Sequence, residues 1–215
     1  MTVPQSASEV VDMLICLAHL VEDTAEELGA LDASLGDGDL GVTMRKGFTA
    51  IETKLSDPEL SVVHPGDVLV LAGTTMASVA PSTLGTLLGF GFVKAGKKVA
   101  DKESLDGAAW SVIWRTIVDS IATQGKAQRG DKTILDALVP GAEAFDSALE
   151  RGDSVEEAAL EAYVAARQGF EDTARMQARQ GRAGRYYEHS VGYKDAGARM
   201  GALIFQAFSR SEQAS

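Results

Sequence analysis

The stretch TAEELGALDASLGDGDLG, residues 24–41, decides between two classes of fold. Its end, Gly36 to Gly41, fits the G-x-G-x-x-G pattern, which places backbone amides against a dinucleotide pyrophosphate when a strand precedes it and a helix follows. Residues 24–35 have no strand character, and the two aspartates inside the loop would repel a bare pyrophosphate. The pattern therefore does not indicate a doubly wound α/β fold.

Helix signals lie on both sides of this stretch. Ser6 and Glu9 form a possible capping box for a helix that we expect to end near Gly29, and Asp131 is expected to cap a later helix. The run at 66–80 fits a buried strand or a buried helix, and we favour a helix. The remaining expected helices lie at 43–55, 83–99 and 103–123, after the loop 125–133, after a second capping pair at Ser154 and Glu157, and up to about Phe208. Seven or eight such segments predict an all-α helical bundle.

The bulk composition is that of a globular protein, with 45% hydrophobic and 24% charged residues. A length of 215 residues predicts one domain, 1–215. The formal net charge of −11 argues against binding to nucleic acid or to an anionic membrane, so a phosphate ligand would need bound cations. No signal peptide or membrane-length apolar run is present, which makes the cytoplasm the expected location.

Three carboxylates crowd into the loop that opens this section. Asp32, Asp37 and Asp39 fall within eight residues, among glycines that let the backbone turn tightly. Crowded oxygen ligands favour a hard cation, but an EF-hand calcium loop needs an acidic twelfth position, where this chain has Thr43 or Phe48. Magnesium fits better, because it takes one or two carboxylates and completes its shell with water and phosphate. A solvated acidic turn that caps a helix is the alternative.

Three separated segments together resemble the nucleotide-binding L subunit of the dihydroxyacetone kinase family. They are LDASLGDGDLG (31–41), GKAQRGDKTILD (125–136) and QARQGRAGRYYEHSVGYKDAGA (177–198), and they occur in the family's order. The resemblance covers nearly the whole chain. It implies an antiparallel eight-helix barrel that holds ADP or ATP and two magnesium ions in the loops at one end.

The resemblance also assigns roles by position. It makes Asp32, Asp37 and Asp39 the magnesium ligands, with Asp37 bridging, and it places Arg182 near the transferring phosphoryl group, so these four form the expected catalytic set. The expected nucleotide-binding residues are Arg182, then Leu40, Gly41, Val42 and Thr43 at a helix N-terminus, Ser82 and Thr83 in a phosphate loop, Gly125 and Ile134 beside the adenine, and Asp195, Ala196 and Gly197, which would close the site. Leu40 and Pro81 depart from the family pattern, which commonly has a polar residue after the last aspartate and a longer phosphate loop.

The implied activity is half of a kinase. A partner of the K type would hold a small ketose, such as dihydroxyacetone or a tetrulose, and the phosphate would come from exchangeable ATP or from a bound ADP recharged by a phosphotransferase relay protein. A homodimer or hetero-oligomer is expected. Two other functions remain open at this point: a non-catalytic, nucleotide-dependent regulator of another protein, and a helical interaction module with an acidic turn.

Overall fold

Several helices begin at a short polar residue whose side chain accepts a hydrogen bond from a backbone N–H of the first turn. Ser6 and Ser154 each accept a hydrogen bond from the backbone N–H of the glutamate three residues later, and the serine N–H in turn donates to the carboxylate of that glutamate. Both expected capping boxes are therefore confirmed. Ser82, Asp106 and Asp195 cap later helices in the same way, without the returning glutamate.

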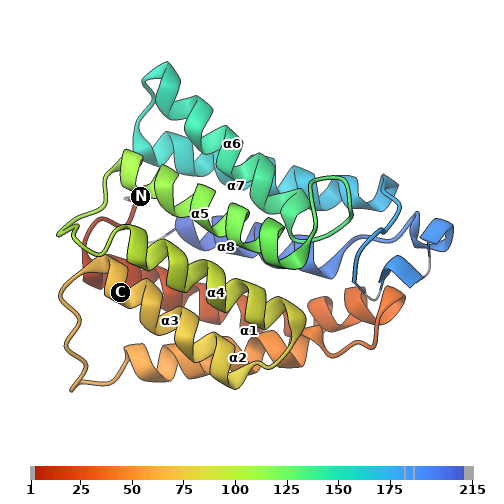
Figure 1. Cartoon of the computed structure of the whole chain (residues 1–215), viewed down its shortest axis with the longest axis horizontal. Helices are drawn as coiled ribbons and strands as arrows, with labels where there is room; N and C mark the ends of the chain where they lie inside the picture. The colour runs from red at the N-terminus through yellow and green to blue at the C-terminus, as the bar shows by residue number, and fades with distance from the viewer. Residues whose placement is uncertain (1–2, 182, 186, 211–215) are drawn as a thin grey trace.

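The computed structural model describes residues 3–181, 183–185 and 187–210. This part of the chain contains eight α-helices and no strand (Figure 1). The helices are α1 (Ala7–Leu35), α2 (Leu40–Leu55), α3 (Pro65–Val79), α4 (Thr83–Lys98), α5 (Gly107–Gly125), α6 (Leu135–Arg151), α7 (Val155–Asp172) and α8 (Ala196–Phe208). Short 3-10 turns lie between α7 and α8.

Each helix packs against the next along the chain, and α8 packs back against α1, so the helices close a ring. Successive helices run in opposite directions (Figure 1). The expected antiparallel eight-helix barrel is thus confirmed. As a result, the connections that precede α2, α4, α6 and α8 gather at one end, at the right of Figure 1, while α1 begins and α8 ends at the other.

Aromatic side chains fill part of the barrel interior. Trp110 and Trp114, four residues apart on α5, are both buried and stack with ring centroids 5.4 Å apart. Phe205 and Phe208 of α8 pack against them. The Trp110 indole also donates to the Pro4 carbonyl at 2.7 Å, which fastens the chain before α1 to α5. Along the described chain, no helix is both long and apolar enough to cross a membrane.

Several of the expected helix boundaries were wrong; α2, for example, begins at Leu40 and not at 43. The first helix does not end near Gly29 but continues to Leu35, because Leu28 and Leu35 are buried and this packing outweighs the roughly 1 kcal/mol that a glycine costs inside a helix. The fifth begins at Gly107, after the Asp106 cap, and not at 103. Asp131 accepts from Gln128 N–H inside its own loop and does not cap α6, which Ile134 precedes.

Candidate functional site

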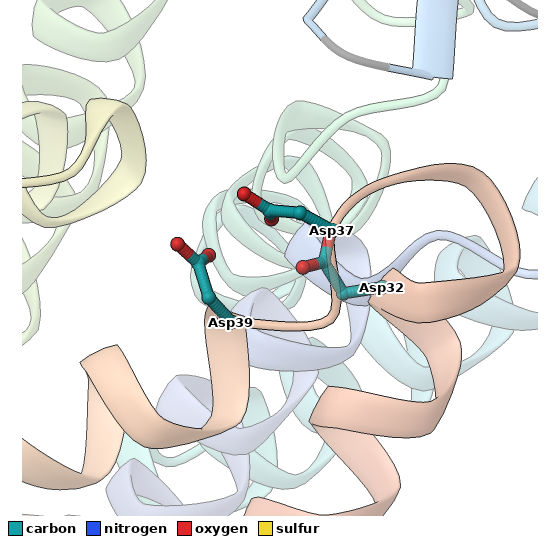
Figure 2. Close-up of side chains that lie close together, drawn as sticks. All are labelled: Asp32, Asp37 and Asp39. Carbon is teal, nitrogen blue, oxygen red and sulfur yellow. The ribbon is translucent and has the colours of Figure 1, made fainter.

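The last turn of α1 and the loop after it bring three carboxylates together. Asp32 lies on α1, Asp37 lies in the loop and Asp39 immediately precedes α2. One oxygen from each lies within 4.8 Å of the others. Figure 2 shows the carboxylates turned toward a common space. Asp32 was expected in a loop after a helix end near Gly29, and it lies instead on the last part of α1, which runs to Leu35.

Two glycines make this geometry possible. Gly38 has φ +77°, a left-handed conformation that side chains disfavour, and it reverses the chain between Asp37 and Asp39. A Cβ at Gly36 would lie 2.5 Å from the Asp32 Oδ1 atom. A glycine there leaves room for the Asp32 carboxylate to turn into the cluster.

The negative charges of the three carboxylates repel one another. Partial burial raises the pKa of Asp32 above its ordinary value, and the neighbouring charges of Asp37 and Asp39 raise it further. The Leu40 N–H, which donates to Asp32 Oδ2 at 3.3 Å, works in the opposite direction. A divalent cation would relieve the repulsion, so the three carboxylates fit the hard-oxygen chemistry of magnesium.

A helix cap does not account for the whole cluster. Asp39 occupies the N-cap position of α2, yet its side chain makes no capping hydrogen bond. Asp32, seven residues before Asp39, instead accepts from the Leu40 N–H, the first of the helix. The carboxylate of Asp39 is therefore turned toward the other two, which a simple capping turn does not require.

A pocket of about 250 Å³ adjoins the carboxylates at this end of the barrel. Asp32 and Asp39 line it, and so do the apolar side chains of Leu84, Leu87 and Ile121. The N-cap residues of all four even-numbered helices also line it: Asp39 before α2, Ser82 before α4, Ile134 before α6 and Asp195 before α8. This follows from the antiparallel order, because every second helix begins at the same end.

Helix ends give the pocket two kinds of electrostatic character. Four helix N-termini lie at the pocket, and the partial positive charge of a helix N-terminus suits phosphate oxygens. The C-terminal turn of α1, which contains no basic residue, adds partial negative charge beside the aspartates and suits a cation. An acidic protein can in this way hold an anion and a metal ion side by side.

Most residues expected at the nucleotide lie around this pocket. Those that line it are Leu40, Ser82, Thr83, Gly125, Ile134, Asp195, Ala196 and Gly197. Gly41, Val42 and Thr43 continue the first turn of α2 but do not line the pocket, and Val42 is exposed. Arg182 lies outside the described residues. The Ser82 Oγ accepts from Gly85 N–H at 3.0 Å, so this hydroxyl also caps α4.

The expected site residues do not include four polar residues that line the pocket, Lys132, Thr133, Gln180 and Lys194. Each lies inside one of the segments quoted for the family resemblance, so the sequence indicated that these residues are near the site. It did not indicate that they line the pocket, because this depends on how the α5–α6 and α7–α8 connections fold against each other. Lys194 also pairs with Glu171 at 2.6 Å.

Asp195 is the most strongly perturbed acid in the pocket wall. Burial raises its pKa to about 7, and the charges of Asp136 and Asp32 add to this effect. The Ala198 N–H, which donates to its Oδ1 at 2.6 Å, and the Lys132 ammonium oppose the shift. The Asp195 backbone N–H donates to Thr173 Oγ1 at 2.9 Å, which ties the start of α8 to the end of α7.

Comparisons with known proteins agree on the family. The family model described as the DAK2 domain matches residues 34–210. The chain is 32% identical, over 193 residues, to the ADP-binding subunit DhaL of the PEP-dependent dihydroxyacetone kinase of Escherichia coli, covering 90% of this chain and 91% of that subunit. It is 36% identical over 183 residues to the L-erythrulose kinase of Pectobacterium atrosepticum, but spans only 31% of that protein's length.

A solved structure shows the same fold. The crystal structure of the dihydroxyacetone kinase of Citrobacter freundii superposes with a TM-score of 0.75 and 25% identity, over 99% of this chain and 36% of that one. The match therefore covers the entire ring of helices, with the carboxylates and pocket at its end. This chain belongs to the family of DAK2 domains.

Proposed function

We propose that this chain is the nucleotide-binding subunit of a two-component kinase that phosphorylates a small ketose. The observation that supports this most strongly is the cluster of Asp32, Asp37 and Asp39 beside a pocket at which four helices begin. A magnesium nucleotide needs both features, carboxylates for the metal and backbone N–H groups for the phosphates. The similarity to an ADP-binding kinase subunit supports the same assignment.

Each part of the site would have a separate task. The three aspartates would hold magnesium, as two ions with Asp37 between them. The helix starts at Leu40 and Thr83 would receive the phosphates, and Leu87, Ile121 and Ile134 would contact the base. Magnesium would supply charge neutralisation for phosphoryl transfer. Arg182 would add a cation at the transferring group.

The acceptor would come from a partner. In this proposal a K-type subunit holds the ketose, dihydroxyacetone or a tetrulose, and transfer occurs across the interface between the two chains. The single-chain L-erythrulose kinase supports a second component, because this chain matches only about a third of it. The name of the Escherichia coli relative favours a phosphate source recharged by a relay over free ATP exchange. A cytoplasmic location is part of the same proposal.

Calorimetric titration with ADP and ATP, with and without magnesium, tests the nucleotide site. Asp37→Ala should abolish magnesium-dependent binding, whereas Asp12→Ala, an exposed aspartate on the same helix as Asp32, should leave it unchanged. No binding by the unaltered chain would contradict the proposal.

A coupled kinase assay tests the proposed phosphoryl transfer. Alone, the chain should show little phosphorylation of dihydroxyacetone, and addition of a K-type subunit should raise the rate. Nucleotide binding that no K-type subunit converts into turnover would instead indicate a regulator.

A further inference from the structure

One lysine side chain is buried within the wall of the pocket. Lys132 belongs to the connection between α5 and α6, borders the pocket, and has a relative exposure of only 1%. Burial deprives its ammonium group of water, which lowers its pKa, and the charge of Asp195 partly opposes this shift. Such a group needs hydrogen-bond acceptors inside the protein.

The acceptors are two backbone carbonyls of the connection between α7 and α8. Lys132 Nζ donates to Met176 O at 3.2 Å and to Ser190 O. The first carbonyl lies where this connection leaves α7, and the second lies where it returns toward α8. The ammonium group therefore joins the outgoing and returning arms of one connection.

Neighbouring hydrogen bonds reinforce this junction. Ala178 N–H donates to Ser190 Oγ at 2.8 Å, which links the two arms directly. Arg179 N–H donates to Asp131 O at 3.1 Å, which links the outgoing arm to the loop that carries Lys132. The two connections thus form one hydrogen-bonded unit, with the ammonium at its centre.

The backbone at Lys132 is held in an unfavourable conformation. Its φ is +62°, in the left-handed region that side-chain-bearing residues seldom occupy. The buried Asp136 carboxylate accepts from Gly130 N–H at 2.5 Å and from Thr133 N–H at 2.7 Å, on either side of Lys132. These bonds fix the loop so that the lysine points inward.

Simple stability does not require a charge at this position. An apolar side chain of similar length would fill the same space without the cost of removing an ammonium group from water. What the charge adds is directional bonding to two carbonyls, and the residues between them include Gln180, Gly181 and Ala183, which line the pocket. Two of the hydrogen bonds that hold this pocket-lining segment therefore come from the ammonium group.

We propose that Lys132 is a positioning residue of the nucleotide site, which holds the α7–α8 connection as a wall of the pocket through Met176 and Ser190. This inference rests on the proposed nucleotide binding. It assigns Lys132 no contact with the phosphates. Its effect on the nucleotide passes through the backbone that it holds.

Lys132→Met tests the proposal, because methionine keeps the length of the side chain and removes the charge. Lys126→Met is a matched control, since Lys126 lies in the same loop with a positive φ of 50° but is exposed. Without nucleotide, Lys132→Met should speed hydrogen exchange at residues 176–181 and 187–190 and leave exchange in α1 to α5 unchanged. It should weaken Mg-ADP binding roughly tenfold or more, or about 1.4 kcal/mol.

Chemical rescue separates positioning from a general loss of structure. Lys132→Cys in a Cys16→Ala background, alkylated with 2-bromoethylamine while unfolded and then refolded, restores an ammonium group at nearly the same distance. We expect it to regain most of the lost affinity and the slow exchange. Recovery of neither, or a Lys132→Met variant equal to the Lys126→Met control in both measurements, would overturn the proposal.

The two proposals can fail separately. If the unaltered chain binds no Mg-ADP, the proposed function fails, whereas the exchange rates still show whether Lys132 holds the connection. If the unaltered chain binds Mg-ADP and Lys132→Met binds it equally well, only the positioning role fails. Faster exchange throughout the barrel, with unchanged affinity, would indicate a purely structural lysine and would also contradict the inference.

Discussion

At the scale of single residues, the pocket end of the barrel concentrates groups whose charged forms are disfavoured. Burial raises the pKa values of Asp32, Asp136 and Asp195 and lowers that of Lys132. Each of these groups lies at or beside the pocket, and perturbed groups of this kind gather at functional sites more often than elsewhere. Keeping these groups charged costs the ligand-free protein free energy. A ligand that stabilises their charged forms would recover part of that free energy.

Asp195→Asn should remove a pH-dependent contribution to stability. The folded-state pKa of about 7 exceeds the ordinary value of 3.8, so the folded protein binds a proton more readily. Between these values the carboxyl lowers the free energy of unfolding as pH rises, by up to about 1.4 kcal/mol per pH unit. Asparagine can still accept from Ala198 N–H, so the cap is retained.

Urea unfolding between pH 5 and pH 8, without nucleotide, measures this effect. The variant should gain stability relative to the unaltered chain as pH rises toward 7, and the difference should level off above it. Asp106→Asn, at the exposed N-cap of α5, controls for the loss of a capping charge. Parallel pH profiles for Asp195→Asn and the unaltered chain would contradict the prediction.

At the scale of helices, α3 and α4 pack with their backbones unusually close. A Cβ at Gly89 would lie 2.7 Å from the Gly73 carbonyl oxygen, whereas a Cβ at Gly91, also on α4, would meet Ile117 at an ordinary 3.4 Å. Gly89→Ala should therefore destabilise the protein by about 1–3 kcal/mol through overpacking.

Gly91→Ala is the matched control on the same helix, and it should be neutral or stabilising by up to about 1 kcal/mol because alanine favours the helix. Thermal unfolding of both variants provides the comparison. Equal stability of the two would show that α4 can move away from α3 at little cost.

The helices themselves could largely be predicted from the sequence, because their signals are local. The capping pairs at Ser6 and Ser154 and the spacing of Trp110 and Trp114 are properties of short segments, and the structure confirms them. The end of α1 could not be predicted, because buried Leu35 borders the pocket together with residues of helices distant in sequence. The aspartate cluster could be predicted, because its three residues lie within eight positions of the sequence. The Lys132 bonds to Met176 and Ser190 had none, since they join connections far apart along the chain.

At the scale of the whole molecule, the antiparallel ring of helices gives the two ends of the barrel different electrostatic properties. Antiparallel order brings the starts of α2, α4, α6 and α8 to the pocket, so backbone dipoles provide local positive character in a chain of net charge −11. Free nucleotide should be repelled by that overall charge, and magnesium should reduce the repulsion.

Mg-ADP should accordingly raise the melting temperature of the chain more than ADP or magnesium alone. At a ligand concentration about 100 times the dissociation constant, binding adds about 2.7 kcal/mol, which corresponds to roughly 5–10 °C for a protein of this size. Differential scanning calorimetry measures the shift, with Mg²⁺ plus inorganic phosphate as a control. An equal rise with ADP in the presence of a chelator would contradict a metal-dependent site.

The start of α1 and the end of α8 share one end of the barrel (Figure 1), and the pocket lies at the other end, where α2, α4, α6 and α8 begin. A tether attached at either place would fix the molecule by its far side. Protein immobilised in this way on a sensor surface would present the pocket to the flowing solution, so a tag at either place should not obstruct ligands that enter it.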